Sequence, residues 1–304
     1  FTERYLGVSL LGMPFLMASL TLNNQLRMQG NAAYAMVGIV SGAVLNVALD
    51  PIFIFLLGLK VQGAALATVI GQVVSFVLLL RMSHHEGNIG VSWRKFSPSW
   101  RALKEIFYGG SPSLSRQGLL CFSTMMLNHA AGAWGDEAIA GMSIVSRIAM
   151  LVMAVVIGLG QGFQPLCGFC YGAGLYGRLK RAWWFTVGVG TVFLFCVSAI
   201  GWVFCSGLIG LFRDDAGVIA VGVVALRWQL STIPLNALTM ASNMLTQTCR
   251  KPWRANLLAA SRNGLFFIPS ILLLPQWLGL QGVEMCQSVS DIFAFLVSVP
   301  TMIY

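Results

Sequence analysis

The residues best suited to chemistry are oxygen-bearing side chains inside otherwise apolar stretches. Asn46 and Asp50 lie four residues apart, so on a helix their side chains share one face. Pro51 follows and frees the backbone carbonyl of Val47, because proline donates no hydrogen bond. Thr68 adds a hydroxyl at a similar depth on the next apolar stretch. Several such oxygens can bind Na+, whereas a proton needs only the carboxylate, so this set predicts a site for H+ or Na+.

Asp50 is the only deep ionisable side chain expected in the apolar stretches before residue 82. A charge inside a bilayer is costly, which makes such a residue a functional candidate. No lysine or arginine within the neighbouring stretches could neutralise it. We interpret Asp50, with Asn46 and Thr68, as a site that takes up and releases a small cation. A purely structural role, in which Asp50 only hydrogen-bonds neighbouring helices, stays open.

A second candidate set lies in the last third of the chain. Arg262 and Asp291 are expected at similar depths on two apolar stretches, where they could form a buried ion pair. Asp291 also occupies the position of Gln72 in an internal repeat, described below, so both are expected to line a central cleft. Pairing and a substrate or proton role both stay open. Further arginines disfavour a cation site in this half: Arg116, Arg147 and Arg227.

The sequence contains no recognisable enzymatic or cofactor motif. Nothing matches GxxxxGKS/T, so ATP hydrolysis is not supported, and neither GxSxG nor HExxH is present. Cys167 and Cys170 have CxxC spacing, but without a second pair or a nearby histidine they are interpreted as small apolar residues. We expect no cofactor and no metal other than Na+. An intramembrane enzyme is the alternative from another functional class, and no set of catalytic residues supports it.

Composition identifies the elements that must position these residues. Of 304 residues, 57% are apolar and 10% are charged, against about 25% charged in soluble domains, and the mean hydropathy is +0.78. Long apolar runs without alternation exclude a β-barrel and predict an all-α polytopic membrane protein. Nine transmembrane helices are expected, over residues 5–26, 32–57, 63–81, 109–133, 138–161, 180–204, 217–243, 254–274 and 281–303.

The distribution of charge predicts the orientation of these helices. The net charge is +9, yet the basic residues gather in short segments between apolar stretches, which favours a lipid bilayer over nucleic acid as their partner. One side of the membrane would carry Arg27, Arg81, Arg94, Lys95, Arg101, Lys104, Arg178, Lys180, Arg181, Arg250, Lys251 and Arg254. The other side would carry Arg4, Lys60 and Arg213. The positive-inside rule makes the first group and the C-terminus cytoplasmic.

An internal repeat organises the spans. Residues 23–77 can be laid over 242–296 without a gap, and Asn24 then meets Asn243. Spans one to three thus repeat as spans seven to nine in the same orientation, which indicates a parallel repeat about an axis along the membrane normal. Spans four to six have no partner. We therefore expect three further helices before the first residue, and twelve in all, in two six-helix bundles.

The repeat also predicts the division of the chain. Residues 1–81 would be the C-terminal half of the first bundle, residues 82–108 a cytoplasmic linker, and residues 109–304 the second bundle. Within the linker, Trp100 to Phe107 is expected to form a short amphipathic helix on the membrane surface.

Several short segments resemble the multidrug and toxin extrusion (MATE) family, most nearly its MepA-like bacterial branch. The resemblance extends over the whole chain, which is similar to helices four to twelve of a twelve-helix member. It rests on LRMQG at 26–30, LNVALDP at 45–51, GAALAT at 63–68, GLGQGFQP at 158–165 and YGAG at 171–174.

The resemblance implies specific roles for residues already singled out. The family's cation site uses an aspartate on the first helix, an Asn and an Asp four residues apart on the fifth, and a Thr on the sixth. Asn46, Asp50 and Thr68 match this pattern in type and spacing, whereas the first-helix aspartate has no counterpart in the chain.

The resemblance also implies an activity. Members of the family exchange external Na+ or H+ for cytoplasmic amphipathic drugs, often lipophilic cations, by alternating access of two bundles. A monomer in a cell membrane, the bacterial inner membrane in particular, is expected. A flippase for lipid-linked precursors, from the same superfamily, is the alternative that shares this fold.

Overall fold

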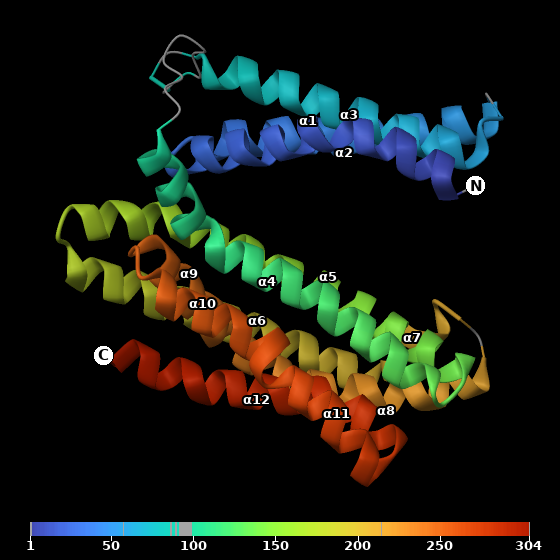
Figure 1. The fold of residues 1–304 in the computed structure, drawn as a ribbon. Coiled ribbons are helices and arrows are strands. Elements are labelled where there is room, and N and C mark those ends of the chain that lie inside the picture. The colour runs from blue at the N-terminus through green and yellow to red at the C-terminus, as the bar shows by residue number, and fades with distance from the viewer. Residues whose placement is uncertain are drawn as a thin grey trace. The chain divides into compact units, whose positions relative to one another are not determined.

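The computed structural model describes residues 2–56, 58–85, 87, 88, 90, 99–213 and 215–303 of the chain. These residues form helices joined by short turns, and no strand occurs among them. The chain divides into two compact units, Phe1–Ser97 and Pro98–Tyr304 (Figure 1). The all-α fold is thereby confirmed.

The first unit consists of three long helices. Helix α1 spans Thr2–Met28, α2 spans Ala32–Pro51 and continues as the π-helical turn η1 at Ile52–Leu56, and α3 spans Lys60–Ser83. The turn between α1 and α2 contains Gly30 at φ 90°, a left-handed conformation that favours glycine. Two short turns therefore suffice to place three apolar helices side by side.

Small residues let α2 and α3 approach closely. The carbonyl oxygen of Gly42 lies 2.7 Å from the position that a Cβ on Gly71 would occupy, and a Cβ on Gly42 would overlap the Ser75 hydroxyl. Leu79 fills the space in front of Gly38. Contacts through small residues are how helices commonly pack where lipid replaces water and no hydrophobic force acts between them.

We expect Gly42→Ala to destabilise the first unit, because the added methyl group would overlap the Ser75 hydroxyl and the Gly71 carbonyl. Overpacking of this kind costs about 1–3 kcal/mol. The matched control is Gly7→Ala on α1, where a Cβ would meet nothing within 4 Å. Thermal unfolding of the full-length protein in detergent measures both variants. Equal unfolding temperatures for the two would contradict the close packing of α2 and α3.

The second unit contains the remaining helices. Their bounds are α4 Trp100–Gly132, α5 Asp136–Gly172, α6 Tyr176–Val203, α7 Cys205–Gly210, α8 Ala216–Thr232, the 3-10 turn η3 Ile233–Leu235, α9 Asn236–Thr248, α10 Pro252–Ala260, the π-helical turn η4 Ser261–Leu265, α11 Phe267–Leu278 and α12 Leu280–Ile303. Its largest apolar cluster draws on α4, α5, α7, α8, α11 and α12. Ile209, Leu226 and Phe267 are among its most deeply buried members.

Eight helical segments in the described part of the chain are long and apolar enough to cross a membrane. Helix α4 lies at the fourth expected span but is not one of the eight, so the number of nine spans stays a prediction. The expected span 138–161 is too short, since α5 continues through Pro165 to Gly172. A membrane helix tolerates an internal proline where its surroundings satisfy the freed carbonyl, and the first left-handed residue after Pro165 is Gly174.

The segment between α3 and α4 ends earlier than the expected linker, which extended to residue 108. Helix α4 begins at Trp100, so residues 100–108 are the first turns of one continuous helix. The expectation of a separate surface helix there is wrong, because the helix continues without a break through Gly109, Gly110 and Pro112. Residues 86, 89 and 91–98 of the expected linker, including Arg94 and Lys95, lie outside the described residues, as do Leu57 and Asp214.

The two copies of the repeat are offset by one residue from the expected register at their first turn, which joins α1 to α2 and α9 to α10. Asn23 Nδ2 donates to the carbonyl oxygen of Ala35 at 2.9 Å, and Asn243 Nδ2 donates to that of Ala255 at 2.8 Å. Each bond ties a helix to the one that follows it. The structural counterpart of Asn243 is therefore Asn23, and the match with Asn24 is wrong by one residue.

Helices α3 and α12 keep the expected register, in which Gly71 matches Ser290. In the first unit Gly71 lies against the carbonyl oxygen of Gly42. In the second unit the Ser290 hydroxyl donates to the carbonyl oxygen of Arg262. Gly71 and Ser290 thus occupy equivalent places, and the residues that follow them on α3 and α12 are equivalent as well.

Candidate functional site

Asn46 and Thr68 join α2 to α3. Asn46 Nδ2 donates to Thr68 Oγ1 at 3.3 Å, and the Thr68 hydroxyl donates to the carbonyl oxygen of Ala64 at 2.9 Å. Both side chains are half-buried. The sequence predicts a similar depth for Asp50 and Thr68, whereas the side chain that Thr68 contacts is Asn46, one turn before Asp50.

Asp50 lies one turn beyond Asn46 on the same face of α2. Its Oδ1 atom is buried and has no hydrogen-bond partner among the residues that the structure describes. No ion pair found in that part of the chain involves it. An unpaired, buried carboxylate oxygen is costly, so this atom is suited to bind a proton or a cation.

The backbone next to Asp50 changes its helical form. Pro51 is the last residue of α2, and the π-helical turn η1 follows. In that turn the carbonyl oxygen of Phe53 lies 2.7 Å from the position that a Cβ on Gly63 would occupy, so glycine is needed where α3 packs against η1. Single π-helical turns within helices are frequent at functional sites.

Gln72 lies one turn beyond Thr68 on α3 and faces α1. Its Oε1 atom is buried, finds no hydrogen-bond partner in the described ranges, and lies against Gly12, where a Cβ would overlap it. The structure thus places Gln72 in the contact between α1 and α3. That Gln72 also lines a central cleft stays a prediction.

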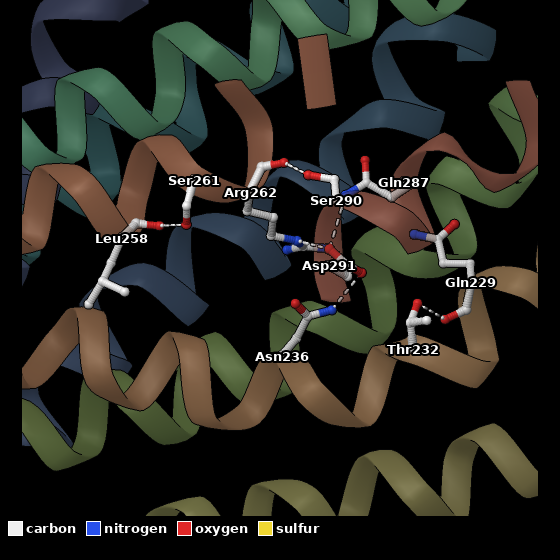
Figure 2. Close-up of polar contacts among 9 residues, drawn as sticks. All are labelled: Gln229, Thr232, Asn236, Leu258, Ser261, Arg262, Gln287, Ser290 and Asp291. Carbon is white, nitrogen blue, oxygen red and sulfur yellow. Dashed lines mark hydrogen bonds and ion pairs between the residues drawn. The ribbon is translucent and has the colours of Figure 1, made fainter. Parts of the chain in front are cut away.

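Asp291 is the centre of a polar cluster in the second unit (Figure 2). Its side chain is fully buried. Oδ1 accepts hydrogen bonds from Arg262 Nε at 2.7 Å and Gln287 Nε2 at 3.1 Å, and Oδ2 accepts one from Asn236 Nδ2 at 2.9 Å. The donors come from η4, α12 and α9, so one carboxylate ties three segments of the chain together.

Both oxygen atoms of Asp291 are therefore satisfied, one of them by a guanidinium group. A carboxylate with both oxygen atoms engaged by these donors has little capacity for a further cation. The ion pair expected between Arg262 and Asp291 is present, and their contact with a substrate stays a prediction. Asp50 and Asp291 thus differ in kind: the first has a free oxygen in the described structure, and the second is compensated.

Sequence reasoning missed two of the three partners of Asp291. Gln287 lies four residues before it on α12, a spacing that places both side chains on one face and could have been recognised. Asn236 follows the 3-10 turn at Ile233–Leu235, 55 residues from Asp291, and no local pattern links the two.

Long apolar helices, polar clusters buried between them and a three-helix element that occurs twice define this chain as a polytopic α-helical membrane protein. A family model described as MatE matches residues 112–272, which is more than half of the chain. The chain belongs to the MatE family, and the resemblance noted in its sequence is confirmed.

Two named relatives come from staphylococci. The chain is 29% identical over 287 residues to the multidrug export protein MepA of Staphylococcus aureus, covering 93% of this chain and 62% of that protein. It is 28% identical over 286 residues to MepA of Staphylococcus saprophyticus, with the same coverage. The chain thus spans less than two thirds of the length of these relatives.

Solved structures of transporters share the fold. An outward-facing multidrug resistance MATE family transporter of the MOP superfamily is similar with a TM-score of 0.90 and 26% identity, covering 98% of this chain and 68% of that one. A MOP superfamily transporter from Pyrococcus furiosus is similar with a TM-score of 0.91 and 25% identity, with the same coverage.

Proposed function

We propose that the chain forms part of a cation-coupled antiporter that exports amphipathic organic compounds by alternating access. The observation that carries the proposal is the buried Oδ1 atom of Asp50, which lacks a partner in the described structure. It lies one turn from the contact between Asn46 and Thr68. Membership of the MatE family, and relatives named as multidrug export proteins and transporters, support transport as the class of activity.

The coupling rests on the electrostatics of Asp50. Binding of H+ or Na+ neutralises the carboxylate and lowers the cost of holding it away from water. A conformation that buries the site therefore favours the ion-bound form, and one that opens it to water tolerates the charged form. An ion gradient then shifts the populations of the two conformations, because the ion has a different affinity for each.

The sequence and the family support further properties of the proposed antiporter. We infer lipophilic, cationic small molecules as substrates, since 14 methionines and 19 phenylalanines suit an adaptable apolar cavity. The clustered basic residues support a cytoplasmic C-terminus. We also infer that the protein is a monomer in the bacterial inner membrane.

The test uses the full-length protein in proteoliposomes. Transport of a fluorescent lipophilic cation is followed with an inward Na+ gradient, an inward proton gradient or neither, at equal ionic strength. We expect one gradient to raise the rate about tenfold over the rate without a gradient, as a modest population shift would. Transport that responds to neither gradient would refute the proposal.

A further inference from the structure

Ser9 on α1 has a hydroxyl group that the packing of the first unit leaves unsatisfied. Its Oγ atom is buried and has no hydrogen-bond partner among the described residues. Elsewhere on α1, the Ser19 hydroxyl donates to the carbonyl oxygen of Phe15 at 2.7 Å, and the Thr21 hydroxyl to that of Met17 at 2.9 Å. Helical hydroxyls commonly find such an acceptor four residues earlier. Ser9 is an exception on its own helix.

The packing of α1 against α3 places Ser9 at the depth of Thr68. A Cβ on Gly12 would lie 3.0 Å from Val69 Cγ2 and would overlap the amide of Gln72. The two helices run in the same direction, because the rings of Phe15 on α1 and Phe76 on α3 are in contact further along both helices. Ser9 precedes Gly12 by three residues, or roughly 4.5 Å along the helix, and Thr68 directly precedes Val69. Ser9 and Thr68 therefore lie at nearly the same level.

The turn between α1 and α2 independently places Ser9 at the depth of Asp50. Asn23 on α1 donates to the carbonyl oxygen of Ala35 on α2, which aligns the two antiparallel helices at that point. Ser9 precedes Asn23 by about four helical turns, and Asp50 follows Ala35 by about four turns as well. Because both helices rise by the same amount per residue, Ser9 and Asp50 come level with each other.

We propose that Ser9 is a further ligand of the ion at the Asp50 site and that it gives the site its preference for Na+. This inference rests on the function proposed above. Ser9 and Asp50 each have one buried oxygen without a partner in the described structure. With Thr68, which contacts Asn46 one turn before Asp50, the three helices of the first unit each supply an oxygen within about one helical turn of depth. A single cation among them would satisfy both unpaired atoms.

The arrangement favours Na+ over a proton. A serine hydroxyl can donate to a carboxylate directly, yet Ser9 and Asp50 are not hydrogen-bonded to each other. A proton could bind Asp50 alone, but it would leave the Ser9 oxygen unsatisfied, because a proton joins only two atoms within hydrogen-bond distance. A hard cation, in contrast, binds several oxygen ligands from separate elements and can lie between atoms that are too far apart to share a proton.

The experiment measures Na+ binding to the purified full-length protein with radiolabelled sodium, together with Na+-driven transport in proteoliposomes. Ser9→Ala removes the hydroxyl, Ser9→Thr retains it, and Ser19→Ala is the matched control on the same helix, since the Ser19 hydroxyl is bound to its own backbone. Ser9→Ala should raise the Na+ concentration for half-maximal binding about tenfold, which corresponds to about 1.4 kcal/mol. Ser9→Thr and Ser19→Ala should bind Na+ like the unmodified protein.

Several outcomes separate this inference from the proposed function. Unchanged Na+ affinity in Ser9→Ala, or an equal loss in Ser19→Ala, would overturn the role of Ser9 and leave the antiporter intact. Transport that is driven by a proton gradient and is unaffected by Na+ would also overturn the role of Ser9 and leave the antiporter intact. If the unmodified protein responds to neither gradient, both proposals fail. The unfolding temperature of each variant is compared with that of the unmodified protein, to identify a loss of Na+ affinity that comes from misfolding. If Ser9→Ala is misfolded, the Na+ affinity of Ser9→Thr decides whether the Ser9 hydroxyl binds the ion.

Discussion

Asp50→Asn should abolish the response of transport to an ion gradient. Asparagine keeps the size of the side chain and an oxygen acceptor, but it has no charge, so it neither takes up a proton nor attracts Na+ strongly. The gradient-driven rate in proteoliposomes should fall about tenfold, to the rate measured without a gradient. Binding of the lipophilic cation should persist, because the change affects the ion and not the apolar surface.

A matched control separates this effect from a general loss of acidic charge. Asp136 is an exposed acid in the first turn of α5, and Asp136→Asn should leave gradient dependence unchanged. Asp50→Glu keeps the carboxylate on a longer side chain and should retain a reduced gradient dependence. Normal ion dependence in Asp50→Asn would remove Asp50 from the mechanism.

Arg262→Met should strongly destabilise the second unit. The variant leaves the Asp291 carboxylate fully buried with only two neutral donors, Gln287 and Asn236. Removing one partner of a buried ion pair costs about 3–5 kcal/mol, because the remaining charge is uncompensated. Thermal unfolding of the full-length protein in detergent should show a clearly lower transition temperature.

The chain offers an exposed ion pair for comparison. Arg213 Nη2 lies 3.5 Å from Asp215 Oδ2, and both side chains reach the surface. Because surface pairs contribute about 0–1 kcal/mol, Arg213→Met should change the unfolding temperature little. The double variant Arg262→Met with Asp291→Leu removes both buried charges and should recover part of the lost stability. Equal effects of Arg213→Met and Arg262→Met would show that the buried pair does not stabilise the fold.

The two copies of the three-helix element carry different chemistry at equivalent places. Gln72 on α3 is the counterpart of Asp291 on α12, and Gly42 on α2 stands where the second copy has Arg262. Gly42 allows α2 to touch α3, whereas the guanidinium group of Arg262 requires an acid opposite it. The charged pair therefore belongs to one copy, and the other copy has its acid at Asp50, about two turns along α2 from Gly42.

The helical, membrane-crossing character of the chain could be predicted from the sequence, because hydropathy and the absence of alternation are properties of consecutive residues. The sequence also indicated that Thr68 lies near the set formed by Asn46 and Asp50 and that Arg262 can pair with Asp291, since charge and polarity are rare in such stretches. The expected helix ends were less accurate: α5 continues beyond the expected end to Gly172, and α4 begins before the expected start, at Trp100.

Which polar atoms have hydrogen-bond partners could not be predicted from the sequence and depends on how the helices pack. Asn236 reaches Asp291 from a distant segment, and Ser9 has no acceptor among the described residues although Ser19, of the same type on the same helix, has one. The register of the repeat, which differs by one position between its first turn and its last helix, likewise became clear only from contacts. The physical reason is that hydrogen-bond satisfaction depends on the few ångströms between neighbouring helices, which helix packing sets and a pattern along one chain does not encode.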